Sequence, residues 1–133
     1  VKDVDFGRHE IVVRSGKGGH DRVTILPASL IPALREQLRE AEKIYQTDLK
    51  RGVRCTLPGA IERKYPSAAL EWAWWYVFPA TKPFVEKETG RVMRHHLHET
   101  VLQRAVKQAV RDARLSKNAS CHTFRHSFAT HLL

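Results

Sequence analysis

The chain has 133 residues, of which 42% are hydrophobic and 28% charged, and this composition excludes a disordered or fibrous protein. A formal net charge of +9 favours a polyanionic partner such as nucleic acid, although charge alone specifies no chemistry. No apolar run approaches the roughly 20 residues that a membrane span needs, and the two cysteines lack the spacing of a disulfide framework, so we expect a cytoplasmic domain.

Two β-rich segments near the N-terminus predict a β-hairpin. Residues 11–13 and 22–26 flank the glycine-rich run Ser15-Gly16-Lys17-Gly18-Gly19. Lys17 is therefore expected near the tip of the turn. On its own a turn lysine is usually only solvated, and this run does not fit the phosphate-binding P-loop pattern.

An amphipathic helix of about five to six turns is predicted between Pro27 and Gly52. Ser29 can cap its N-terminus. Apolar residues recur at helical spacing along one face, namely Leu34, Leu38, Ala41, Tyr45 and Leu49. We expect a structural role for this helix.

Residues 53–90 predict an irregular segment, because four prolines interrupt any periodic pattern. A short helical stretch is expected at residues 60–64. Five aromatic residues fall within seven positions: Trp72, Trp74, Trp75, Tyr76 and Phe78. We expect Trp72, Trp75 and Phe78 to form a small satellite core.

The last third of the chain is strongly basic and predicts two helices. Residues 91–133 hold eight Lys or Arg against two acidic residues. Apolar residues at helical spacing predict a helix over residues 99–115. In the closing segment Phe124, Phe128 and Leu132 recur every four residues, so we expect a helix whose apolar face packs firmly into a core.

His122 and Arg125 are the residues best suited to chemistry on a phosphate. They are three apart, so they share one face of the closing helix. The planar fork of Arg can bind two nonbridging phosphate oxygens, and His exchanges a proton near neutral pH. A bare His-x-x-Arg is nevertheless more often two solvent-facing residues on a basic helix.

Closely spaced histidines also suggest zinc, in particular His122 with His126, and His95 and His96 with His98. No cysteine or acidic residue completes a recognisable ligand set. We therefore expect no metal site.

The closing sequence His-Thr-Phe-Arg-His-Ser-Phe-Ala-Thr-His-Leu-Leu closely resembles the second-motif helix of tyrosine site-specific recombinases. The resemblance implies that His122 and Arg125 are catalytic. The Gly16-Lys17-Gly18 turn resembles the catalytic lysine hairpin of that family, so Lys17 would be the general acid that protonates the departing 5′-hydroxyl. The implied fold is α+β, mainly helical with a small antiparallel sheet, and the chemistry runs through a 3′-phosphotyrosyl intermediate without a cofactor.

Residues 57–66, 75–79 and 94–96 resemble the insertion that is peculiar to integron integrases. The resemblance implies that residues 53–96 form this insertion and that the parent bacterial enzyme captures and shuffles gene cassettes. Its partners would be folded single-stranded cassette sites and double-stranded integron sites, bound by a homotetramer. The candidates for DNA binding are Trp74, Arg94, His95 and His96, with the rings stacking on protruding bases.

The resemblance covers residues 1–133 as a partial catalytic domain. The family's first-motif arginine, its tyrosine nucleophile and its N-terminal DNA-clamping domain find no counterpart in the sequence, so the chain by itself is expected to be inactive. Besides the possibility that the chain is merely a stable folded core, two functional alternatives stay open. One is a Xer- or phage-type recombinase on duplex sites, against which the insertion argues; the other is a noncatalytic DNA-binding module.

Overall fold

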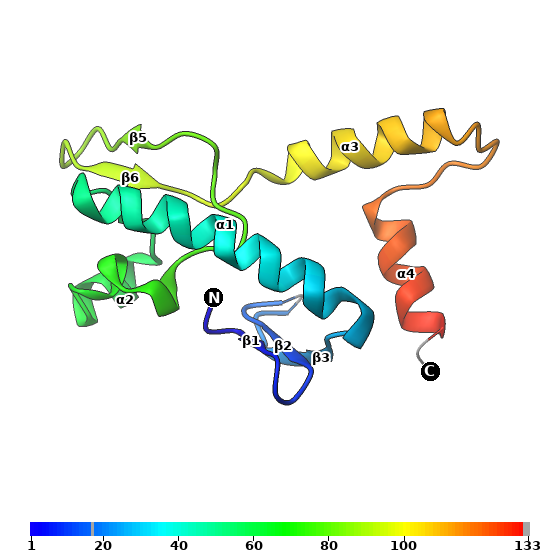
Figure 1. Ribbon diagram of the computed structural model, residues 1–133, viewed down its shortest axis with the longest axis horizontal. Helices are drawn as coiled ribbons and strands as arrows, with labels where there is room; N and C mark the ends of the chain where they lie inside the picture. Colours follow the sequence, from blue (N-terminus) through cyan, green and yellow to red (C-terminus); the bar gives the residue numbers. More distant parts are fainter. Residues whose placement is uncertain (17, 132–133) are drawn as a thin grey trace. The chain divides into compact units, whose positions relative to one another are not determined.

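A computed structural model of the chain describes residues 1–16 and 18–131 (Figure 1). The chain divides into two compact units, Val1–His96 and Leu97–Leu133. The described residues form four α-helices and two three-stranded sheets, which confirms the α+β expectation. No helix among these residues has the length and apolar character needed to cross a membrane.

The first sheet contains the predicted hairpin. Its strands β1 (Val4–Asp5), β2 (Glu10–Val13) and β3 (Arg22–Ile25) are antiparallel in that order. The N–H of Gly16 donates to the carbonyl of His20 at 3.0 Å, and Gly18 and Gly19 have φ angles of 87° and 76°, which glycine adopts without a steric cost. Lys17, the predicted general acid, lies outside the described residues.

The predicted long helix is α1 (Ile31–Lys50), but its start differs from the prediction. Ser29 lies in the 3-10 turn η1 (Ala28–Leu30) and makes no side-chain cap. The N–H of Leu30 donates to the carbonyl of Pro27 at 3.0 Å, so a backbone turn takes the place of a cap. Towards its other end the helix buries Asp48 and leaves Leu49 40% exposed, contrary to the predicted apolar face.

The segment predicted to be irregular contains a second sheet, in the order β4 (Arg54–Cys55), β6 (Val92–Arg94), β5 (Phe84–Val85). Strand β4 is parallel to β6, and β5 is antiparallel to it. The short helix α2 (Gly59–Lys64) lies where one was predicted, and the 3-10 turns η2 (Ala68–Leu70) and η3 (Trp72–Trp74) follow it.

The aromatic residues of this segment form the core of the first unit together with α1. Tyr45 is 5.1 Å from Trp75 and 5.2 Å from Trp72 between ring centroids, and its hydroxyl donates to the carbonyl of Leu70. Phe78 is 52% exposed, so its predicted core position is wrong. Trp75 is 1% exposed, so its predicted core position is confirmed, whereas the chain bends at residues 77–78 and Phe78 stays outside that core.

A buried ion pair joins the end of α1 to β6. Arg94 donates from Nε and Nη2 to the two carboxylate oxygens of Asp48, and from Nη1 to the carbonyl of Ala80 at 2.6 Å. Asp48 is 2% exposed and Arg94 6%. The prediction that Arg94 contacts DNA therefore differs from the structure, because its guanidinium binds groups in the protein interior.

The second unit consists of α3 (Glu99–Asp112) and α4 (Cys121–His131). Neither helix contains a buried residue. Phe124 and Phe128, which were predicted to point into a core, are 58% and 39% exposed. Two short helices offer too few neighbours to enclose an aromatic ring. The third member of the predicted face, Leu132, lies outside the described residues.

Replacing Asp48 by alanine should lower the free energy of unfolding by about 3–5 kcal/mol, because Arg94 would remain buried without its counterion. Urea denaturation measures the change. Glu36→Gln, which removes an exposed partner of Arg39, is the control and should cost less than about 1 kcal/mol. Equal small losses in both variants would show that the buried pair is not a structural link.

Cys55 should resist thiol reagents in the folded chain. Its side chain is fully buried, and burial raises the pKa of the thiol to about 11, whereas the thiolate is the reactive form. Cys121 is partly exposed. At pH 8 one thiol should react quickly with a disulfide reagent, and Cys121→Ser should abolish that fast phase.

The raised pKa of Cys55 also makes the stability of the folded chain depend on pH. Because the pKa of Cys55 is higher in the folded chain than the unfolded value of about 8.5, its burial contributes stability at neutral pH that is lost as the pH rises towards 11. In the reaction with the disulfide reagent, two rapidly reacting thiols at pH 8 would contradict the burial of a protonated Cys55.

Candidate functional site

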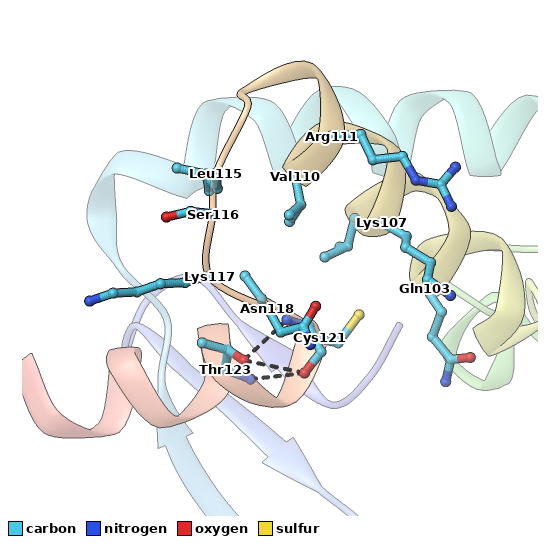
Figure 2. A pocket seen from close by; sticks show the side chains of 13 residues that line it. Gln103, Lys107, Val110, Arg111, Leu115, Ser116, Lys117, Asn118, Cys121 and Thr123 are labelled. Atoms are coloured by element: carbon cyan, nitrogen blue, oxygen red, sulfur yellow. Dashed lines mark hydrogen bonds between the residues drawn. The ribbon is translucent and has the colours of Figure 1, made fainter.

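The first candidate surface is on α4, which carries His122 and Arg125. A pair of reciprocal contacts organises the start of the helix: the N–H of Ser120 donates to Thr123 Oγ1 at 3.1 Å, and the N–H of Thr123 donates to Ser120 Oγ at 3.4 Å (Figure 2). Such a capping arrangement satisfies N–H groups that the first turn leaves unpaired. His122 lies within this ordered first turn.

Both predicted catalytic residues of α4 are exposed. Their spacing of three residues puts them on one face of the helix. The His122 ring meets the His126 ring edge-on, with centroids 5.3 Å apart. A phosphate approaching α4 would therefore find an imidazole and a guanidinium side by side.

A hollow of about 780 Å³ lies between α3 and the start of α4 (Figure 2). Three cationic side chains line it, Lys107, Arg111 and Lys117, and none of the described residues around it is acidic. Valines 106 and 110 add apolar surface. The concentration of positive charge next to α4 favours a polyanion at this end of the second unit.

The second candidate surface is in the first unit, around Trp74. Its indole is half-buried and packs against the aromatic core. The ring helps to line a hollow of about 420 Å³, together with Arg14 and Tyr76. The ammonium of Lys2 lies 4.2 Å from the Trp74 ring centroid, a cation–π contact that the sequence did not predict.

His95 and His96 form a pair of exposed rings whose centroids are 3.9 Å apart. Tyr76 meets both rings edge-on, at 5.9 and 5.4 Å. Thr56 Oγ1 lies 2.6 Å from Nδ1 of His95, and the hydroxyl of Tyr76 donates to the carbonyl of Thr56 at 2.6 Å. Thr56 and Tyr76 therefore position the histidines.

Burial raises the pKa of Tyr76, so its phenol keeps the proton that it donates to Thr56. Sequence reasoning missed both positioning residues. Tyr76 belongs to the aromatic cluster, which was its only signal. Thr56 had none, because it lies 39 residues from His95 along the chain.

The histidines that suggested zinc are placed differently. Nδ1 of His98 accepts the N–H of Thr100 at 3.3 Å and thereby caps α3. Among residues 1–16 and 18–131, no three His, Cys, Asp or Glu side chains are grouped so that they could hold a metal ion.

The chain is similar in sequence to known proteins over its whole length. The profile of the Phage integrase family matches residues 1–133. Two proteins called integrase/recombinase, from Escherichia coli and Pseudomonas aeruginosa, are each 47% identical over 134 aligned residues, which cover the whole chain and 40% of the relative. A tyrosine recombinase of Thermosipho africanus (strain TCF52B) is 32% identical over 62 residues, 43% of this chain and 22% of that protein. The chain thus spans about two fifths of the length of the two integrase/recombinases.

Proposed function

The chain belongs to the Phage integrase family, and on that basis we propose that it is part of the catalytic domain of a tyrosine site-specific recombinase. The observation that carries the proposal is the family match over residues 1–133, with His122 and Arg125 on one exposed face of α4. The proposed reaction cuts and rejoins DNA strands.

In the proposed mechanism Arg125 binds nonbridging oxygens of the scissile phosphate and stabilises the charge that develops on a phosphorane-like transition state. His122, on the same face, exchanges a proton with the reacting phosphate group. A tyrosine from outside this chain forms the 3′-phosphotyrosyl bond, while Lys17 protonates the departing 5′-oxygen. Attack by the 5′-hydroxyl of a second strand breaks that bond and completes strand exchange without hydrolysis.

Tyr45, Tyr65 and Tyr76 precede the His-Thr-Phe-Arg motif, whereas the family's nucleophile follows it. Two of them also have structural tasks, since Tyr45 is in the aromatic core and Tyr76 supports the histidine pair. None is proposed as the nucleophile.

We further propose that the parent enzyme is an integron integrase and that residues 53–96 recognise folded single-stranded cassette sites. Unpaired bases that protrude from a hairpin need flat partners, and Trp74, His95 and His96 offer rings at the surface of the first unit. Double-stranded integron sites and a homotetramer on DNA complete this proposal. Arg94 is left out of it because the side chain is buried.

In the full-length protein, Lys17→Ala should slow strand cleavage by about two to four orders of magnitude while leaving site binding nearly intact, because a general acid is lost. A substrate with sulfur at the 5′-bridging position has a better leaving group and should restore the rate. Arg125→Ala should stay slow on both substrates, since its role is charge stabilisation. If Lys17→Ala also remains slow on the sulfur substrate, Lys17 is not the proton donor.

Trp74→Ala in the full-length protein should weaken binding to a bulged hairpin by about one to two orders of magnitude, because a stacked base contributes about 1–3 kcal/mol. Binding to the same hairpin without its bulges should barely change. Phe78→Ala is a matched control, since Phe78 is an exposed aromatic residue of the same segment and does not line the Trp74 hollow. Equal losses on both DNAs would instead give Trp74 a structural role and favour a recombinase of paired duplex sites.

A further inference from the structure

A second hollow of the first unit is lined almost entirely by charge. Its volume is about 390 Å³, and its lining residues are Arg54, Glu62, Arg63, Pro66 and Arg91. Three guanidinium groups face one carboxylate there, so the site carries a net positive charge. It shares no lining residue with the hollow at Trp74. We call it the arginine hollow.

Separate structural elements hold its three arginines. Arg54 is in β4, between the buried residues Val53 and Cys55, and its backbone pairs with Met93 of β6. Arg91 immediately precedes β6, and its carbonyl accepts the N–H of Glu86 at 2.8 Å across the β5–β6 turn. Arg63 lies in α2. The charges are therefore brought together by the fold and are not a run of neighbours in the sequence.

The internal contacts of the hollow are long. Nη1 of Arg54 donates to the carbonyl of Pro66 at 3.4 Å, and Nη1 of Arg91 lies 3.3 Å from a carboxylate oxygen of Glu62. Both exceed the usual range of an N–H···O bond, about 2.7–3.2 Å. Each contact engages one nitrogen of a guanidinium group that carries five N–H donors, so the set has donor capacity for a ligand.

The donor set fits an anion with several oxygens. A guanidinium fork matches two nonbridging oxygens of a phosphate, and several forks around one hollow suit a tetrahedral group better than a planar carboxylate. The site is open: the side chain of Arg91 is 51% exposed and that of Glu62 33%. A polymer backbone can reach such a site. Pro66 is the only uncharged residue among those that line it, which disfavours an acidic peptide with apolar side chains.

From these observations, and on the proposal that DNA is the partner, we propose that the arginine hollow binds a phosphodiester of the DNA backbone. Glu62 then competes with the phosphate for Arg91, because the Glu62 carboxylate contacts the Arg91 guanidinium in the unbound chain. When DNA binds, the contact between Glu62 and Arg91 gives way to contacts between the arginines and the phosphate.

The test is a salt titration of DNA binding by the full-length protein, followed by fluorescence anisotropy on a fully paired duplex. Arg63→Gln and Arg91→Gln should each weaken binding and should reduce the slope of log K against log salt by about one, the change expected for one lost phosphate contact. Glu62→Gln should tighten binding by about two- to fivefold, since an exposed competing ion pair is removed. If the contact between Glu62 and Arg91 only stabilised the local structure, Glu62→Gln would weaken DNA binding instead.

Arg39→Gln is the matched control, because it removes the same charge from an exposed arginine on α1 that lies outside the hollow. It should leave the affinity and the salt slope nearly unchanged. Circular dichroism and thermal melting check that each variant is folded. Equal losses for Arg39→Gln and Arg63→Gln, or weaker binding by Glu62→Gln, would overturn the site.

The outcomes separate this site from the proposed function. If the wild-type protein binds the duplex, and neither Arg63→Gln nor Arg91→Gln changes the affinity or the salt slope, only the arginine hollow is disproved. Failure of Trp74→Ala to distinguish bulged from unbulged hairpins removes base recognition alone. If the full-length wild-type protein bound neither the duplex nor the hairpins, DNA would be removed as a partner, and both proposals with it.

Discussion

The contact between Asp48 and Arg94 is the interaction on which the first unit depends. Burying two charges is costly, and the pair is tolerable only when its hydrogen bonds are satisfied, as they are here by both carboxylate oxygens and the carbonyl of Ala80. Through this pair α1 fixes β6, and β6 in turn pairs with β4 and β5. The two exposed histidines follow β6 directly, and Arg54 of the arginine hollow lies in β4. Arg94, which was predicted from the sequence to contact DNA, thus has a structural role: it fixes the strand after which the exposed His95 and His96 follow.

The candidate surfaces make different physical demands, and the fold meets each one separately. Recognition of an unpaired base needs a flat ring in a fixed orientation, which packing against the core gives Trp74 and which Tyr76 and Thr56 give the histidine pair. Contact with a phosphate needs charged forks and little apolar surface, as in the arginine hollow. The proposed stabilisation of a reacting phosphate needs a guanidinium and a proton-exchanging group on one face of one element, and Arg125 and His122 have that spacing on α4.

Much of the fold could be predicted because its signals are local. The hairpin, α1 and α4 follow from glycine placement and apolar periodicity, whereas the catalytic roles of His122 and Arg125 remain predictions that rest on their spacing and a family resemblance. The second sheet was missed because β4 and β5 have only two residues each, too few for an alternating pattern. Burial of Arg94 and the contact of Lys2 with Trp74 were missed because their partners are distant in sequence. The exposure of Phe124 shows that periodicity identifies an apolar face but not whether anything covers it.

The sequence separation of 46 residues from Asp48 to Arg94 also imposes an order on folding. Helix α1 can form from local contacts as soon as its own residues are available, yet the counterion of Asp48 is added to the growing chain only much later. Loop closure over this distance must precede the gain from the contact, so the docking of α1 on the second sheet is a late event compared with helix formation. During synthesis the first unit would pass through a stage with a formed helix, an unpaired carboxylate and an incomplete aromatic core. The first unit can therefore complete its core only after β6, which immediately precedes His95 and His96, has been synthesised.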